Sequence, residues 1–273
     1  MNFKKIIHIY KKYGVLTISF IVLSTLLLII LIVPIINVIF QEDPITIITT
    51  LLKERVITAI VNSFVCSLLA TIFALILGIP LAYLLARYEF PGKRIIDSLL
   101  DLPILIPHSV AGIILLIAFG QNGIFGQFFN LFGIRFYDSY WGIILAMFFV
   151  SCPFLIKGAR DVFTMVNPNY EKAARTLGAS RFRTFIDITL SLSWRGIISS
   201  SILCWARGIS EFGAVYILVS MPVTGPVLVA GEYTGSGLSA ALPIAIALVL
   251  VSLLIFILLK LIQGPTKKDK RSY

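Results

Sequence analysis

The sequence predicts an all-α polytopic membrane protein with about six transmembrane helices. Three observations support this fold class: the composition, the long apolar segments and the distribution of basic residues. Hydrophobic residues make up 58% of the 273 positions, charged residues make up 13%, and the mean hydropathy is +0.98. Because soluble domains carry roughly 25% charged residues, a soluble chain of this composition could not cover its surface with polar groups. Lipid is therefore the expected solvent.

Six apolar segments are separated by polar or charged stretches. Each is near or above the ~20 residues that a helix needs to cross a hydrocarbon core of about 30 Å. The third segment contains Pro103 and Pro107, and the fourth is short, so either of them could be a broken or tilted helix. The predicted spans cover residues 15–40, 56–86, 98–119, 141–156, 196–219 and 241–262.

Basic residues are concentrated in alternate connections between these segments. Nineteen Lys and Arg lie in the two tails and in the second and fourth connections, whereas only Lys53, Arg55 and Arg135 lie in the others. Membrane proteins keep positive charge on the cytoplasmic side, so both termini are expected in the cytoplasm and the protein in the cell membrane. The net charge is +10, but the basic residues flank apolar runs and do not gather on one face. Nucleic-acid binding is therefore not expected.

The predicted domain organisation has four parts. Residues 1–14 form a cytoplasmic tail, 15–40 the first transmembrane helix, 56–262 a transmembrane domain with five further spans, and 263–273 a second cytoplasmic tail. The basic start of the chain imitates a signal peptide. However, the apolar stretch that follows is longer than the ~7–15 residues of a cleaved leader and lacks a small-residue cleavage site. We therefore expect it to be retained as a helix.

Residues that could carry chemistry are sparse. Cys66, Cys152 and Cys204 lie inside apolar runs with no paired spacing, which indicates neither a disulfide framework nor a zinc site. His8 and His108 are a hundred residues apart, and no catalytic or phosphate-binding motif is present. No catalytic residue, metal ligand or cofactor is expected.

The connection between the fourth and fifth predicted spans, residues 157–195, is long enough that it should fold. Asn167 is a suitable N-cap, and Pro168 suits the first position of a helix. Gly178 then predicts a left-handed helix stop, and Ser180 the cap of a second helix. The interpretation is a pair of short cytoplasmic helices bent at Gly178.

The first of these helices has one apolar face. Tyr170, Ala173, Ala174 and Leu177 follow one another at i, i+3, i+4 and i+7. The two alanines permit close approach and the aromatic ring supplies an anchor, whereas a lipid-seeking face would carry larger apolar side chains. The pattern favours a protein partner over a lipid surface.

Residues 171–180, Glu-Lys-Ala-Ala-Arg-Thr-Leu-Gly-Ala-Ser, resemble the EAA loop of ABC importer permeases, and Ile-Thr-Leu at 188–190 fits the continuation of that motif. Lys172 stands where an acidic residue is usual, and Ser191 replaces a proline. The resemblance implies that this pair of helices is the coupling-helix pair, which meets a separate cytoplasmic ATPase. The expected ATPase-coupling residues are Tyr170, Glu171, Ala173, Ala174, Leu177 and Gly178.

Four further stretches resemble the molybdate, tungstate and sulfate permeases of this type I family. They are residues 86–93, 101–112, 119–126 and 207–214. The resemblance runs from residue 56 to the chain end. It implies a machine of two copies of this chain, two ATPase subunits and an external binding protein. The expected substrate is a tetrahedral oxyanion, tungstate or molybdate first and sulfate second.

Arg207 and Glu211 are an ionisable pair inside the fifth predicted span, four residues apart and so on one helix face. Charge inside a membrane costs about 2.5–3.5 kcal/mol per residue on insertion scales and suggests function. One reading is that Arg207 faces a passage used by the oxyanion, with Glu211 holding it or forming part of a gate. The other reading is a salt bridge that only neutralises both charges. The sequence leaves both open.

The alternative from a different class is a stand-alone secondary transporter or channel for a small anion. Such a protein would need ion-coupling carboxylates or broken helices at the membrane midplane. Only Glu211 meets that requirement, and residues 167–190 would then have no purpose. The permease reading is therefore preferred.

Overall fold

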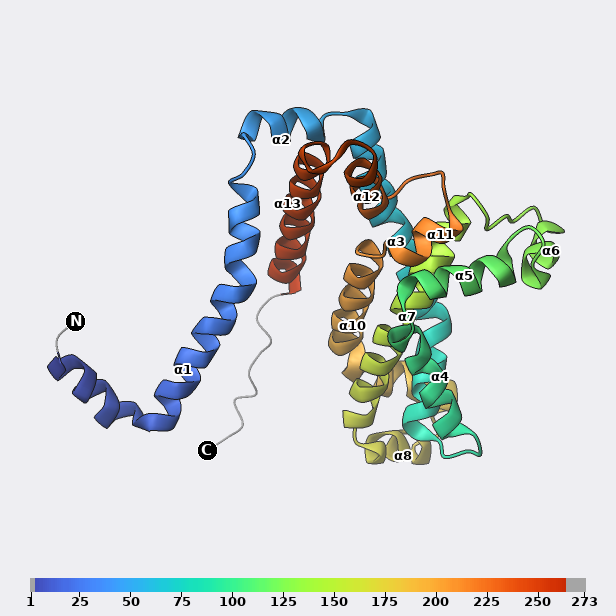
Figure 1. The fold of residues 1–273 in the computed structure, drawn as a ribbon. Coiled ribbons are helices and arrows are strands. Elements are labelled where there is room, and N and C mark those ends of the chain that lie inside the picture. Colours follow the sequence, from blue (N-terminus) through green and yellow to red (C-terminus); the bar gives the residue numbers. More distant parts are fainter. Residues whose placement is uncertain (1–2, 264–273) are drawn as a thin grey trace. The chain divides into compact units, whose positions relative to one another are not determined.

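The computed structural model describes the backbone of residues 3–263 and the side chains of residues 14–259 and 261. Every regular element in that part of the chain is helical and no strand occurs in it, so the predicted all-α class is confirmed (Figure 1). The chain divides into two compact units, Met1–Leu52 with Leu238–Tyr273, and Lys53–Gly237. The basic residues predicted for the two tails lie outside the described side chains.

The first unit contains α1 (Phe3–Ile39), α2 (Pro44–Leu51) and α13 (Leu238–Gln263). Helical backbone angles are interrupted at Gly14, where φ is 69°, a region that glycine enters without steric cost. The long apolar side chains beyond Gly14 are largely exposed on α1, while α2 packs against α13. Such extended apolar exposure fits contact with lipid or with other chains.

The second unit is built around α3 (Glu54–Arg87), α7 (Tyr140–Met165) and α10 (Ser191–Ile209), which pack against one another. Small residues let these helices approach closely, as is usual between membrane helices. A Cβ added at Gly158 of α7 would collide with Ser200 of α10, and one added at Gly208 of α10 would collide with Ser67 of α3. Ser67 Oγ also donates a hydrogen bond of 2.6 Å to the Trp205 carbonyl oxygen.

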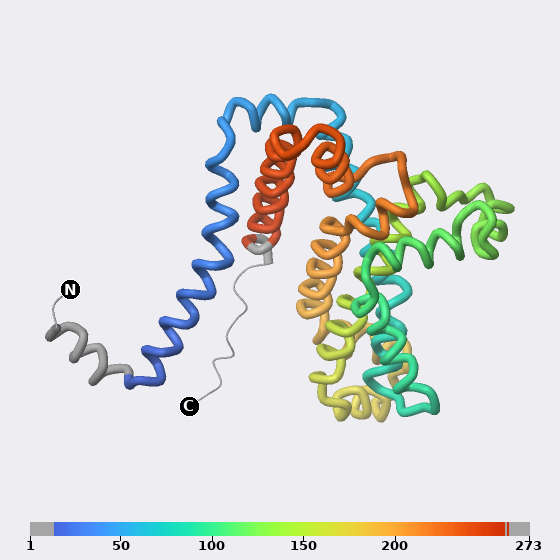
Figure 2. The backbone as a smooth tube through the Cα atoms, viewed as in Figure 1, coloured from blue at the N-terminus to red at the C-terminus, as the bar shows by residue number. Residues whose placement is uncertain are grey.

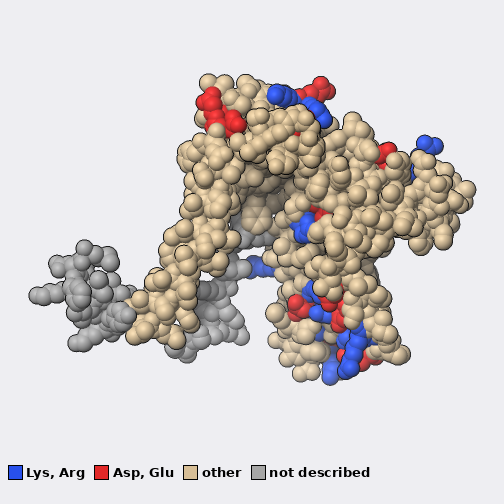
Figure 3. Space-filling view, in the orientation of Figure 1, with Lys and Arg blue, Asp and Glu red and all other residues tan. Residues whose placement is uncertain are grey.

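Shorter helices surround this group. They are α4 (Lys93–Leu105), α5 (His108–Phe119), α6 (Ile124–Asn130), α8 (Pro168–Thr176), α9 (Arg181–Thr184), the π-helix η1 (Phe185–Leu190), α11 (Gly213–Leu218) and α12 (Gly225–Ser236). In the second unit α5 packs against α11, α12 against α3, and α4 against α7. A dense group of charged side chains lies at the end of this unit that holds α8 (Figure 3).

Four helices in the described residues are long and apolar enough to cross a membrane, and five if one bent pair counts as a span. The four match the predicted first, second, fourth and sixth spans: Gly14–Ile39, Glu54–Arg87, Tyr140–Met165 and Leu238–Leu259. The predicted third span is the pair α4 and α5, and the chain bends by 112° between these two helices. The bend is visible in Figure 2. Ile106 at the bend has the extended backbone that a following proline, Pro107, favours.

The predicted fifth span, residues 196–219, differs from the expectation. Helix α10 ends at Ile209, and a break of three residues separates it from α11. Among the described residues, this segment contributes no helix that is long and apolar enough to count as a membrane span. The reason is the polar content of α10, which includes Arg195, Arg207 and several serines.

Candidate functional site

The α8–α9 connection has the local structure that its residues predict. The Asn167 side chain accepts a hydrogen bond of 3.0 Å from the Asn169 backbone N–H, and Pro168 begins α8. Gly178 has a φ of 90° and ends the helix, and the Ala179 N–H donates back to the Ala174 carbonyl oxygen at 3.0 Å. Ser180 then caps α9. The two caps and the glycine stop are confirmed.

The second helix of the predicted pair is longer than expected. It begins as α9, passes through the π-helix η1 and continues into α10 without a break. A π-helical turn shifts the hydrogen-bond register without ending the helix. Within η1, Thr189 is fully buried, and its hydroxyl donates a hydrogen bond to Glu171 of α8.

Helix α8 presents its apolar face outward. None of its residues is buried. Tyr170 is 57% exposed and Leu177, directly after α8, is 88% exposed, while Ala173 is exposed and Ala174 half-buried. We call Tyr170, Ala173, Ala174 and Leu177 the α8 stripe. An apolar stripe without a partner inside its own chain is suited to contact with another molecule.

Glu171 lies on a different face of α8 and points into the protein. Its Oε1 accepts a hydrogen bond of 2.8 Å from Arg87 Nε and one of 2.7 Å from the Thr189 hydroxyl. Arg87 Nη2 also donates to the Val166 carbonyl oxygen at 2.9 Å, at the end of α7. The Arg87 and Glu171 side chains are only 9% and 14% exposed. This carboxylate therefore joins α8 to α3 and η1 within the chain.

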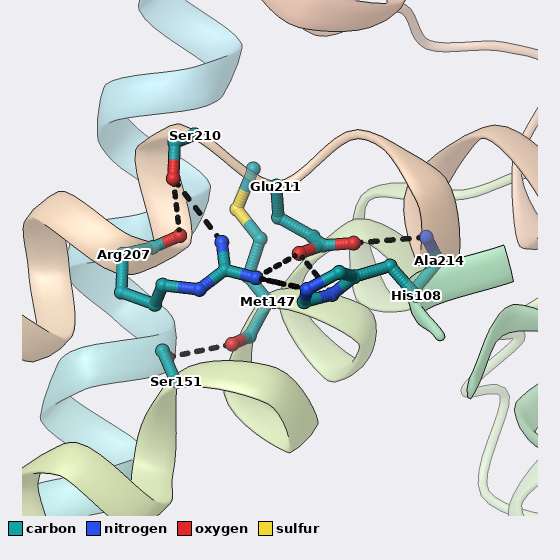
Figure 4. Close-up of polar contacts among 7 residues, drawn as sticks. All are labelled: His108, Met147, Ser151, Arg207, Ser210, Glu211 and Ala214. Carbon is teal, nitrogen blue, oxygen red and sulfur yellow. Dashed lines mark hydrogen bonds and ion pairs between the residues drawn. The ribbon is translucent and has the colours of Figure 1, made fainter. Parts of the chain in front are cut away.

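A second polar site lies at the break between α10 and α11 (Figure 4). Arg207 Nη2 donates to Glu211 Oε2 at 3.0 Å, so the predicted pair does form an ion pair. Glu211 is 1% exposed, and its other oxygen accepts a hydrogen bond of 2.9 Å from the Ala214 N–H at the start of α11. Glu211 thus both neutralises Arg207 and satisfies one of the free backbone N–H groups in the first turn of α11.

His108 is a third member of this site, and no pattern in the sequence pointed to it. Its Nδ1 lies 3.0 Å from Glu211 Oε2, and Arg207 Nη2 lies 2.8 Å from its Nε2. His108 begins α5, which packs closely on α11 because Gly112 faces Ala214. We call His108, Arg207 and Glu211 the Arg207 cluster.

The Arg207 cluster is open on its cationic side. The Arg207 side chain is 21% exposed and that of His108 is 41% exposed, whereas the Glu211 side chain is buried. Arg207 Nη1 also donates to the Ser210 hydroxyl at 3.1 Å. A guanidinium carries five N–H donors in a fixed plane, so donors remain for an anion at the exposed edge. Oxyanions are bound well by this group.

The part of the chain that the structure describes contains no metal-binding cluster and no disulfide. There, no group of three or more His, Cys, Asp or Glu side chains could hold a metal ion. Cys66 and Cys204 are buried, Cys152 is half-buried, and all three are free thiols.

Comparison with known protein families identifies the family of this chain. Residues 74–267 match the model described as "Binding-protein-dependent transport system inner membrane component". The chain belongs to this family. It is thus a multi-pass membrane permease of the ABC importer type and not itself an enzyme.

Individual relatives of this permease agree with that assignment. It is 42% identical over 90% of its length to the "Molybdate/tungstate transport system permease protein WtpB" of Thermococcus kodakarensis, covering 95% of that protein. It is 40% identical to the "Molybdenum transport system permease protein ModB" of Escherichia coli, over 72% of this chain and 90% of that one. The resemblance to the molybdate, tungstate and sulfate group is confirmed.

A solved structure has the same fold. The "bacterial alginate ABC transporter in complex with alginate pentasaccharide-bound periplasmic protein" matches the permease with a TM-score of 0.72, over 93% of this chain and 94% of that one. At 18% identity the match concerns the fold alone. Together the family and the fold do not favour the stand-alone transporter or channel.

Proposed function

We propose that this permease translocates a tetrahedral oxyanion, tungstate or molybdate first and sulfate second, as the membrane subunit of an ATP-driven importer. The anion arrives on an external binding protein, and ATP is hydrolysed on a separate cytoplasmic ATPase. Two copies of the chain form the passage. Support for the substrate comes from relatives named for molybdate and tungstate and from the open cationic edge of the Arg207 cluster.

The observation that carries the proposal is the unpartnered α8 stripe, fixed to a membrane helix by a buried ion pair. A helix with no buried residue gains little from packing and needs other support. Arg87 and Glu171 supply it and leave the stripe free for the ATPase. We therefore assign the ATPase contact to Tyr170, Ala173, Ala174, Leu177 and the Gly178 turn, and assign Glu171 to orienting them.

The proposed topology has six spans with both termini in the cytoplasm. The first, second, fourth and sixth spans are the apolar helices α1, α3, α7 and α13, the third is the bent pair α4 and α5, and the fifth is α10 with α11. Although α10 is polar, it packs against α3 and α7, which are both apolar spans. A charged helix is tolerated at that depth when its charges are paired, as Arg207 is by Glu211.

ATP binding draws the two ATPases together, and the two α8 helices move with them. The spans then tip from an inward-open to an outward-open arrangement, a two-state rigid-body change. The anion enters from the binding protein and passes the exposed edge of Arg207.

The test is stimulation of ATP hydrolysis. The permease is reconstituted with its ATPase in proteoliposomes, and ATP turnover is measured with binding protein that is empty or loaded with tungstate, molybdate or sulfate. The proposal predicts stimulation by the loaded form, strongest for the physiological anion. Anion flux that needs neither ATPase nor binding protein would instead support the stand-alone transporter.

A further inference from the structure

A cavity of about 660 Å³ lies between the end of α3 and the α8–α9 connection, within the second unit. Its α3 wall includes Ile79, Pro80 and Leu84, near the end of an apolar span. Its opposite wall carries Lys172, Arg175 and Arg181. The cavity is therefore amphipathic, with an apolar side and a cationic side.

The cationic side carries positive charge that no group in the described residues neutralises. Glu171 and Arg87 also line the cavity, but they are paired with each other. The side chains of Lys172, Arg175 and Arg181 make no hydrogen bond or ion pair with any described residue. Three cations gathered on one cavity attract an anion and repel one another without it.

The cavity lies on the opposite face of α8 from the α8 stripe. Pro168, Glu171, Lys172 and Arg175 line the cavity and follow at i, i+3, i+4 and i+7, which is one helix face. At 3.6 residues per turn, the centre of that face is roughly 160° from the centre of the stripe. An ATPase docked on the stripe would therefore leave the cavity open.

We propose that this cavity binds one anionic phospholipid, with its phosphate at Lys172, Arg175 and Arg181 and its acyl chains along Ile79, Pro80 and Leu84. The apolar wall belongs to a span, so the cationic wall lies at headgroup depth, and basic pockets at this position suit anionic headgroups. The chain's own tails do not complement the cavity, since both are basic. The bound lipid would brace α8 against α3 beside the Arg87–Glu171 pair.

Native mass spectrometry of the full-length purified permease tests the proposal. The protein is titrated with phosphatidylglycerol and with phosphatidylcholine of the same acyl chains. One phosphatidylglycerol should bind first and more tightly. The double variant Arg175→Gln with Arg181→Gln should weaken that first site about 30-fold, since each basic residue near a membrane surface contributes several-fold to lipid affinity.

The matched control is Arg94→Gln with Arg195→Gln, which removes two exposed arginines on the same expected side but outside the cavity. It should change the first site by less than about twofold. Thermal unfolding verifies that each variant is folded, and single variants at Arg175 and Arg181 replace the double if it is not. Equal weakening in both doubles, or equal affinity for the two lipids, would overturn the proposal.

Two further competition measurements distinguish a lipid from other occupants of the cavity. Inorganic phosphate that displaces the lipid at low millimolar concentration would make the cavity a small-anion site. Displacement of the lipid by the ATPase subunit would make it part of the ATPase interface. Either result would overturn the lipid assignment. Lipid counting needs neither transport nor ATP, so a failure of the proposed transport function would leave this readout unchanged.

Discussion

Arg87 and Glu171 form a nearly buried ion pair, with 2.8 Å between Arg87 Nε and Glu171 Oε1. Arg87 is the last residue of α3, and Glu171 lies in the first turn of α8. The pair therefore links a membrane-spanning helix directly to the helix that we propose as the ATPase contact. We propose that a displacement of α8 is transmitted to α3 through this link.

Breaking the pair should cost stability and coupling together. Arg87→Met removes the cation and leaves the Glu171 carboxylate with neutral hydroxyl donors, those of Thr189 and Tyr83. Losing one partner of a buried pair costs about 3 kcal/mol, the low end of the usual range. We expect a lower melting temperature and ATP hydrolysis that no longer responds to loaded binding protein. The swap Arg87→Glu with Glu171→Arg should recover part of the response.

The control for this prediction is an exposed pair on the same loop. Arg183 and Asp187 lie 3.1 Å apart with side chains 75% and 55% exposed. Exposed i, i+4 pairs contribute about 0.3–0.5 kcal/mol, so Arg183→Met should leave the melting temperature nearly unchanged. Equal losses in both variants would refute a special role for the Arg87–Glu171 pair.

The α8 stripe should bind the ATPase without contributing to the fold of the permease. Leu177 is 88% exposed, so Leu177→Asp should change permease stability by less than about 0.5 kcal/mol. At an interface anchor the same change should weaken ATPase affinity about 30-fold, or roughly 2 kcal/mol. Leu131→Asp, at a leucine 81% exposed after α6, is the control. Unchanged ATPase affinity for Leu177→Asp would exclude the stripe as the contact.

The bend at Gly178 should be needed for the same contact. Alanine there would be held at a φ of 90°, a left-handed conformation that costs about 1–2 kcal/mol. Gly178→Ala should therefore reduce ATPase affinity about tenfold, as measured by titration of the ATPase on the purified permease. Gly231→Ala, at a helical glycine whose added Cβ would meet nothing within 4 Å, should have no such effect. Similar results for the two alanines would contradict the proposed turn.

The topology predicts opposite exposure of the two ends of the second unit. Single cysteines at Thr176 and Leu131, both exposed positions, are introduced after Cys66, Cys152 and Cys204 are replaced. An impermeant thiol reagent added outside intact cells should label the cysteine at 131 and not the one at 176. Labelling of both from outside would rule out the six-span arrangement.

Local signals in the sequence were enough to predict the α8 turn. The cap at Asn167, the stop at Gly178 and the cap at Ser180 each depend on a few neighbouring residues, whose chemistry determines the backbone. The Arg207–Glu211 pair was also predicted from a spacing of four residues. In the structure the pair forms, but Glu211 lies in the break after α10 and not on the helix itself.

Partners that are distant in the sequence could not be predicted in this way. His108 meets Arg207 across 99 positions, and Arg87 meets Glu171 across 84. Both contacts depend on which helices pack together, and a single sequence carries no direct signal for that packing. The role of α10 was also hard to judge, because its packing against α3 and α7, and the hydrogen bond from the Trp205 indole N–H to the Phe64 carbonyl oxygen of α3, become visible only in the fold.

The central claim is that this permease carries an oxyanion past Arg207 with energy from ATP, and uptake measures it directly. Proteoliposomes holding permease, ATPase and loaded binding protein are assayed for tungstate uptake per assembled complex. The assay compares the wild type, Arg207→Leu, Glu211→Leu and the double variant. If the pair were purely structural, removing both charges would be milder than leaving one buried charge alone.

We predict that wild-type uptake requires ATP and binding protein. The double variant should assemble normally but transport at least about tenfold more slowly, because it loses a charge-assisted contact with the anion of about 1.5 kcal/mol or more. Near-normal uptake by the double variant would contradict passage at Arg207. Wild-type uptake without ATP would contradict the importer itself.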